Sequence, residues 1–200
     1  MYKVITISRE FGSGGRTIGK RLAEKLNYKF YDSELVKKVA NESGYDKDFI
    51  EKHGEYASST SRLMFSMSRN VGAINSYNSV YDEIYIAQQK VIEDLSNEGN
   101  VVIVGRCADY ILRNRDDVLN VFIYAPIESR KKRIIEEYKE VEGKPIDKRI
   151  KECDQKRKTY YKTYTGQEFG DVHNYDLSIN SSLFTIDGSV ELIYRVVKEK

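Results

Sequence analysis

The sequence predicts a three-layer α/β fold, in which a five-stranded parallel sheet lies between two layers of helices. Strand-like and helix-like stretches alternate along the chain, which is typical of parallel sheets. The stretches 101–105 and 119–125 are almost continuously apolar, which indicates strands that are buried on both faces. Neither a repeat nor a low-complexity segment interrupts this order.

Each expected element follows from its local pattern. Val4–Ile7 is a β-branched run that ends at polar residues, as a buried strand does at a sheet edge. Ile18, Leu22 and Leu26 then recur every four residues and form one face of an amphipathic helix, which Asn27 is expected to end. The other expected strands are 29–31, 101–105, 119–125 and 177–180; the other expected helices lie around 35–39, 81–95, 110–112, 129–164 and 190–197, with short helices and an exposed segment between 42 and 78.

The bulk properties indicate a single globular domain. The chain has 200 residues, of which 40% are hydrophobic and 32% are charged. Its net charge of +2 is small for a nucleic-acid-binding protein, and no apolar run is long enough to span a membrane. The N-terminus resembles a strand rather than a signal peptide, so we expect a cytoplasmic location. Cys107 and Cys153 form no CxxC pattern and the chain has only two histidines, so no zinc site is expected.

A glycine-rich turn connects the first strand to the first helix. In such a turn the backbone can approach phosphate oxygens closely, and its N–H groups and the helix N-terminus attract negative charge. The turn departs from the pattern GxxxxGK[ST], because Gly15 or Arg16 stands where the lysine is expected. A turn without a ligand is the alternative to a phosphate site. The residues of the predicted site are Gly12, Ser13, Gly14, Gly15, Arg16 and Thr17, and Thr17 can supply the hydroxyl that usually contacts Mg²⁺.

Several stretches of the chain match one known family. They are Ile5–Gly14, Leu22–Tyr28, Phe30–Ser33 and Tyr175–Asn180, together with the pair Gly105-Arg106. On these residues the chain resembles bacterial cytidylate kinase, and more closely the cytidylate-kinase-like branch of the nucleoside monophosphate kinases. The resemblance implies a P-loop NTPase fold with an acceptor-binding helical segment near 33–95 and a mobile helical lid near 128–160. It favours the register that puts Gly15 at the lysine position.

The resemblance also implies roles for individual residues. The loop 12–17 would bind the phosphates of the donor. Asp32 and Ser33 match an Asp-Ser pair that family members place at the acceptor nucleotide. Lys38 falls where a monophosphate-binding arginine lies, and Arg106 matches the arginine of an Asp-Gly-Arg-Asp stretch. Both aspartates of that stretch are replaced, by Val104 and Cys107, and Asp109 follows a turn later.

Positive charge is concentrated in the expected lid. Residues 126–164 contain thirteen Lys or Arg and eight Asp or Glu, a net charge of +5 in a chain of net charge +2. Arginines that close over phosphates neutralise the charge of phosphoryl transfer, and Arg133 and Arg157 are the expected catalytic arginines. Asp154, three residues before Arg157, is placed to orient its guanidinium. A solvated pair of charged helices is the alternative.

These features predict a kinase. We expect transfer of the γ-phosphoryl group of ATP, with Mg²⁺, to CMP or a similar small phosphorylated acceptor. Arg16 would partly replace the missing lysine and Thr17 would face the metal ion. Because the lysine and the two aspartates are absent, two alternatives stay open: a non-catalytic nucleotide-binding protein, and a P-loop kinase for a non-nucleotide metabolite.

Overall fold

A computed structural model describes residues 2–48, 50, 80–138 and 145–199. Five strands form one sheet in the order β2-β3-β1-β4-β5, and every neighbouring pair is parallel. The predicted parallel sheet is therefore confirmed. The strands are β1 (Val4–Arg9), β2 (Lys29–Tyr31), β3 (Val101–Val104), β4 (Val118–Tyr124) and β5 (Leu177–Asn180).

The helices lie where the apolar periodicity predicts them. The long charged stretch forms two helices, α7 and α8, while the last helix is kinked at Thr185, whose φ is 58°. Within the described residues the helices are α1 (Gly15–Leu26), α2 (Ser33–Ser43), α5 (Val80–Glu98), α6 (Ala108–Ile111), α7 (Ile127–Tyr138), α8 (Ile146–Thr165), the 3₁₀ helix η1 (Val172–Asn174) and α9 (Ser181–Glu199).

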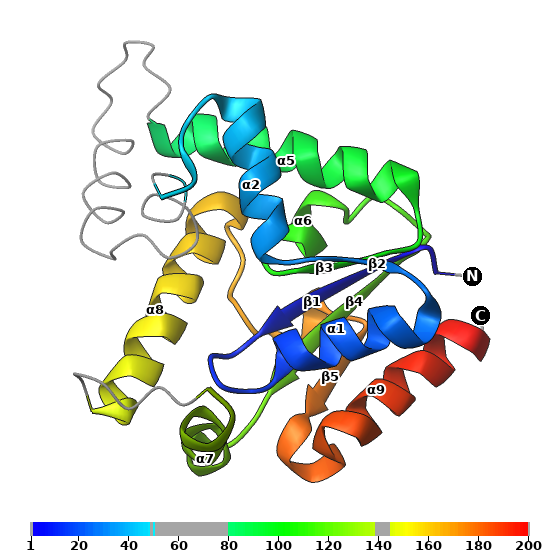
Figure 1. Ribbon diagram of the computed structural model, residues 1–200, viewed down its shortest axis with the longest axis vertical. Helices are drawn as coiled ribbons and strands as arrows, with labels where there is room; N and C mark the ends of the chain where they lie inside the picture. Colours follow the sequence, from blue (N-terminus) through cyan, green and yellow to red (C-terminus); the bar gives the residue numbers. More distant parts are fainter. Residues whose placement is uncertain (1, 49, 51–79, 139–144, 200) are drawn as a thin grey trace.

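Helices cover both faces of the sheet, as Figure 1 shows. Side chains of β1 alternate between the layers: Ile5 and Ile7 pack with α1 and α9, whereas Val4 packs with α2 and α5. Most core side chains of the central strands are fully buried, and this burial is the main source of stability in such a fold. The sheet is thus a rigid support for the loops that follow its strands.

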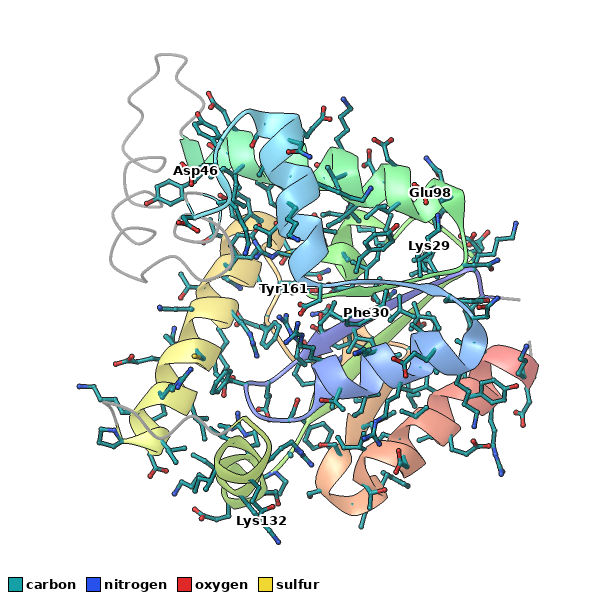
Figure 2. The ribbon with its side chains drawn as sticks, in the orientation of Figure 1. Lys29, Phe30, Asp46, Glu98, Lys132 and Tyr161 are labelled. Carbon is teal, nitrogen blue, oxygen red and sulfur yellow. The ribbon has the colours of Figure 1, made fainter. Side chains whose placement is uncertain are left out.

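The carboxyl ends of the strands meet at one edge of the sheet, where α7 and α8 also lie (Figure 1). Both chain termini lie at the opposite end of the molecule. At that opposite end, Lys29 of β2 forms an ion pair of 2.7 Å with Glu98 of α5 (Figure 2). In open α/β sheets ligands bind outside the carboxyl ends of the strands, so the edge next to α8 is the place to look for a site.

The ends of α1 show how the sequence sets the local backbone. Gly14 precedes the helix with φ of 84°, and Asn27 ends it in the left-handed conformation that was predicted, with φ of 56°. Of the acceptor-binding segment expected near 33–95, residues 49 and 51–79 lie outside the described residues, as do residues 139–144 of the expected lid. No helix in the described part of the chain is long and apolar enough to cross a membrane.

Candidate functional site

The glycine-rich turn between β1 and α1 has a backbone and packing that strongly favour glycine. Gly12 and Gly14 have φ of 78° and 84°, the left-handed region that disfavours side chains. A Cβ on Gly12 would lie 2.8 Å from Cδ1 of Ile134, and one on Gly14 would collide with Ile186. The Ser13 hydroxyl donates a hydrogen bond of 2.9 Å to the carbonyl of Glu10, which closes the turn. The turn is therefore a tightly packed loop with a fixed backbone.

An open cleft of about 410 Å³ lies beside this turn. Among its lining residues four arginines outnumber two carboxylates, so the cleft carries net positive charge. Together with the start of α1, this charge favours an anionic ligand. The lining residues are Arg9, Glu10, Phe11, Gly12, Gly14, Gly15, Arg16, Asp32, Arg149 and Arg157.

Three arginines of α7 and α8 bind the loop by its backbone carbonyl groups. Each arginine donates one hydrogen bond from Nη1 to a backbone carbonyl, and the three carbonyl groups belong to residues within 9–12. The pairs are Arg130 with Phe11 (3.2 Å), Arg133 with Gly12 (3.0 Å) and Arg157 with Arg9 (3.0 Å). The helices of the expected lid are therefore docked on the glycine-rich loop.

Asp154 of α8 joins the loop and the lid helices at one carboxylate. Its Oδ1 accepts a hydrogen bond of 2.8 Å from the Phe11 amide, and its Oδ2 lies 2.6 Å from Nη1 of Arg130. Both side chains of this ion pair are largely buried. The helical spacing predicted that Asp154 orients Arg157; the structure instead pairs Asp154 with an arginine of the neighbouring helix, because α7 packs directly against the start of the loop.

Glu10 faces the same arginine from inside the loop. Its Oε2 accepts a hydrogen bond of 3.2 Å from the Ala125 amide and lies 3.6 Å from Nε of Arg130. Burial raises the pKa of Glu10, while Arg130 opposes the shift. Glu10 therefore links the loop to the end of β4.

Phe11 lies close to two arginines of α8. Its ring centroid is 5.5 Å from the guanidinium carbon of Arg149 and 5.8 Å from that of Arg157. Guanidinium groups are attracted to the face of an aromatic ring at this range. Phe11 thus keeps two cations at the wall of the cleft.

On the other side of the cleft, Arg16 forms an ion pair with Asp32. The Nε of Arg16 lies 2.6 Å from Oδ2 of Asp32, and the two side chains are 64% and 18% exposed. Asp32 occupies the N-cap position of α2 but makes no side-chain capping hydrogen bond. Its carboxylate therefore serves the cleft, whereas a simple helix cap would have bound the backbone of α2.

A buried polar cluster lies behind the cleft. Asp109 of α6 accepts hydrogen bonds from the hydroxyls of Ser8 (3.4 Å) and Tyr161 (2.6 Å), and Figure 2 shows Tyr161 pointing from α8 towards the sheet. Burial raises the pKa of Asp109 to about 6. Ser8 belongs to β1 and Tyr161 to α8, so Asp109 connects these two elements through its hydrogen bonds.

The backbone after β3 is strained. Gly105, Arg106 and Cys107 have φ of 73°, 62° and 56°, and the last two carry side chains. The Arg106 carbonyl accepts a hydrogen bond of 2.9 Å from the amide of Gln88, which holds this conformation. Non-glycine residues in this region are concentrated at functional sites. The strain places the buried Arg106 beside Arg157, at a small cavity behind the cleft.

Comparison with known proteins agrees with this geometry. The sequence profile of the cytidylate kinase-like family matches residues 4–183. The chain belongs to the cytidylate kinase-like family. It is 32% identical to a cytidylate kinase of Archaeoglobus fulgidus, over 98% of this chain and 95% of that protein. It is also 30% identical to a cytidylate kinase of Pyrococcus horikoshii, over 98% of this chain and 86% of that protein.

Solved structures support the fold. A protein from Eubacterium ventriosum of 27% identity matches with a TM-score of 0.73, covering 98% of this chain and 99% of the other. Shikimate kinase from Bacteroides thetaiotaomicron matches with a TM-score of 0.58 at 16% identity, covering 98% of both chains. These likenesses confirm the predicted three-layer P-loop fold.

The structure brings together some of the site residues that the sequence indicated. Gly12, Gly14, Gly15, Arg16, Asp32 and Arg157 line one cleft. Arg133 contacts the loop, and Thr17 is half-buried in the first turn of α1. Lys38 lies apart from them, exposed beside a groove between α2 and α5 and 5.8 Å from the Tyr31 ring. The side chain of Ser33 lies outside the described part of the chain.

Other cleft residues of this family member were missed by sequence reasoning. Arg9, Glu10, Phe11 and Arg149 line the cleft. The first three belong to the stretch that carries the family resemblance, but the glycine pattern drew attention to later positions. Only Arg149 gave a further signal, because it is spaced from Arg157 so that both share a helix face.

Proposed function

We propose that this protein transfers the γ-phosphoryl group of ATP to a nucleoside monophosphate, with CMP as the first candidate. The observation that carries the proposal is the cleft itself, in which a phosphate loop, a helix N-terminus and four arginines face the same space. The relatives that match nearly the whole chain are named cytidylate kinases, which supports the same acceptor class.

The electrostatics of the cleft suit this reaction. A nucleoside triphosphate and a monophosphate bring several negative charges together, and catalysis of phosphoryl transfer consists mainly of positioning and charge neutralisation. An acceptor phosphate is already ionised at neutral pH, so no side-chain base is required. The net positive lining of the cleft therefore supplies what the chemistry needs.

On the donor side, the loop from Gly12 to Thr17 would bind the phosphates through its backbone N–H groups. Arg16 would exchange its bond with Asp32 for one with a phosphate oxygen. Arg133 and Arg157 would neutralise the charge that develops during transfer. Their contacts with the loop support this role, because they fix both guanidinium groups next to it.

On the acceptor side, we assign the monophosphate to the region of Asp32, Ser33 and Arg106. Asp32 supports this because its carboxylate faces the cleft. Lys38 would reach the acceptor only if α2 moved, since it lies beside another groove. The segment 33–95 and the lid 128–160 would then be the parts that close on the two nucleotides.

Magnesium is the expected metal ion. In the described ranges 2–48, 50, 80–138 and 145–199, no three His, Cys, Asp or Glu side chains gather as a metal site. In kinases Mg²⁺ is held by one or two protein oxygens together with phosphate oxygens and water. The Thr17 hydroxyl and a cleft carboxylate, Asp32, would be those protein ligands. Bound there, Mg²⁺ neutralises phosphate charge.

A coupled assay of ADP formation tests the proposal. Purified protein is incubated with MgATP and each of CMP, UMP, AMP, GMP and dCMP in turn. We expect turnover that depends on the monophosphate and is fastest with a pyrimidine. ATP binding without turnover of any acceptor would favour a non-catalytic nucleotide-binding protein.

One observation favours a second acceptor class. The two aspartates that the resemblance expects are replaced by Val104, the last residue of β3, and by Cys107, and these two residues are only 2% and 3% exposed. A nucleotide base would lose a polar contact there. If all monophosphates fail in the assay, a panel of small phosphorylated metabolites tests a P-loop kinase for a non-nucleotide acceptor.

A further inference from the structure

The glycine at the expected lysine position is required by space. Gly15 does not have the left-handed backbone that its neighbours Gly12 and Gly14 have, so other residues would fit its conformation. A Cβ at position 15 would lie only 2.6 Å from the Cβ of Arg9 and 3.1 Å from its Cγ. Real Cβ atoms do not approach side chains so closely. The stem of Arg9 therefore fills the space in which a lysine at position 15 would start.

This close approach is part of the packing of α1 on β1. Gly19 follows Gly15 by one helical turn, and Ile7 precedes Arg9 by two residues. A Cβ on Gly19 would lie 3.0 Å from Cδ1 of Ile7. Residues two apart in a strand lie on the same face, as do residues four apart in a helix. Two glycines of the helix thus face two large side chains of the strand, and Arg9 is the one next to the phosphate loop.

The two positions are exchanged relative to the standard pattern. In GxxxxGK[ST] a glycine opens the loop and a lysine closes it. With Gly15 at the lysine position, Arg9 stands at the first glycine. In this chain the positively charged residue, Arg9, therefore stands at the first glycine position, and a glycine, Gly15, stands at the lysine position.

We propose that Arg9, rather than Arg16, replaces the phosphate-loop lysine and contacts the phosphates of the donor. Arg9 lines the cleft although only 6% of the residue is exposed. A guanidinium group is always charged and can donate two parallel hydrogen bonds to a phosphate, so it is suited to the task of the lysine. Arg16 is less enclosed, because its side chain is 64% exposed.

This inference rests on the proposed function, and a reciprocal exchange tests it. The variants are Arg9→Gly, Gly15→Lys and the double variant, with Arg9→Gln and Arg9→Lys as milder changes. Arg21→Gln is the control for loss of an arginine: Arg21 lies on α1, the helix of Gly15, but pairs with Asp187. Binding of inorganic triphosphate and of ATP is measured by isothermal titration calorimetry, and thermal unfolding reports whether each variant folds.

We expect Arg9→Gly and Arg9→Gln to weaken triphosphate binding about 10- to 100-fold, the loss expected for a charged hydrogen bond. Gly15→Lys should lower the melting temperature because it collides with Arg9. The double variant should recover both melting temperature and binding, and Arg9→Lys should retain most binding. Arg21→Gln should bind as the wild type does.

The outcomes separate this inference from the proposed function. Unchanged binding in Arg9→Gln, or a double variant no better than the two single variants, would overturn the role of Arg9. Absence of triphosphate binding by the wild type would overturn it as well. Binding that depends on Arg9 in a protein that phosphorylates no monophosphate would support Arg9 and reject the proposed kinase reaction.

Discussion

Arg16 and Asp32 form an ion pair of 2.6 Å between the first turn of α1 and the residue that precedes α2. The side chain of Asp32 makes this contact and forms no capping hydrogen bond with its own helix, α2. The pair connects the side of the cleft assigned to the donor with the side assigned to the acceptor. A ligand phosphate would compete with Asp32 for Arg16, so the pair has a direct functional consequence.

Replacing Arg16 by Ala is expected to weaken ATP binding about 5- to 10-fold, because one charged hydrogen bond is lost in a partly exposed place. Folding stability should change by less than about 0.5 kcal/mol, since exposed ion pairs contribute little. Calorimetric titration with ATP and chemical denaturation measure the two quantities. An Arg16→Ala protein with unchanged ATP affinity and unchanged turnover would remove Arg16 from the site.

The ion pair of Asp154 and Arg130 is expected to stabilise the docked lid helices. Asp154→Ala leaves the largely buried Arg130 with Glu10 as its remaining carboxylate and the Phe11 amide without its acceptor. We expect the free energy of unfolding to fall by about 2–4 kcal/mol, less than the roughly 3–5 kcal/mol for a buried pair broken with no other carboxylate nearby. A double-mutant cycle with Arg130→Ala in urea denaturation measures the coupling. Strictly additive losses would show that the two side chains do not stabilise each other.

Gly12 and Gly166 form a matched pair for testing the loop backbone. Both have left-handed φ, 78° and 73°, but a Cβ meets Ile134 at the first and nothing within 4 Å at the second. Gly166→Ala should cost only the backbone term, about 1–2 kcal/mol. Gly12→Ala should cost about 1–3 kcal/mol more from overpacking, and it should also weaken ATP binding. Equal losses of unfolding free energy would mean that Ile134 yields without cost.

Asp109 is expected to make stability depend on pH. Its pKa of about 6 lies above that of an unfolded aspartate, so between about pH 4 and pH 6 the unfolded chain releases its proton first. The favourable contribution of Asp109 to the free energy of unfolding is fully present below pH 4 and is lost as the pH rises through 6. Relative to the wild type, Asp109→Asn should therefore gain about 2–3 kcal/mol between pH 4 and pH 7. A difference in unfolding free energy that is independent of pH would contradict this.

Local patterns predicted the fold well. Apolar runs located the three central strands β1, β3 and β4, and the glycine turn and Asn27 marked both ends of α1, because these features depend on the residues themselves and on near neighbours. Part of the site was predictable for the same reason, since Arg16, Arg133 and Arg157 all contact or line the loop region.

Contacts between distant elements were not predictable in this way. The spacing within α8 favoured Arg157 as the partner of Asp154, but Arg130, on a different helix, binds the carboxylate. The approach of Arg9 to Gly15 is also tertiary, because it depends on how closely α1 packs on β1. From the sequence alone, Gly15 indicates only that the lysine is missing. The structure shows that the Arg9 side chain fills the space that a side chain at position 15 would need.

The most direct test of the central claim is ³¹P NMR of the wild-type protein with MgATP and CMP, compared with Arg157→Ala. We expect the CMP signal to decrease as the signals of ADP and CDP appear in equal amounts. Arg157→Ala should retain ATP binding and lose about 100-fold in rate, as expected for loss of a donor that neutralises transition-state charge. CMP and ATP that remain unchanged in the presence of the folded, ATP-binding wild type, with no other nucleoside monophosphate consumed, would contradict the claim.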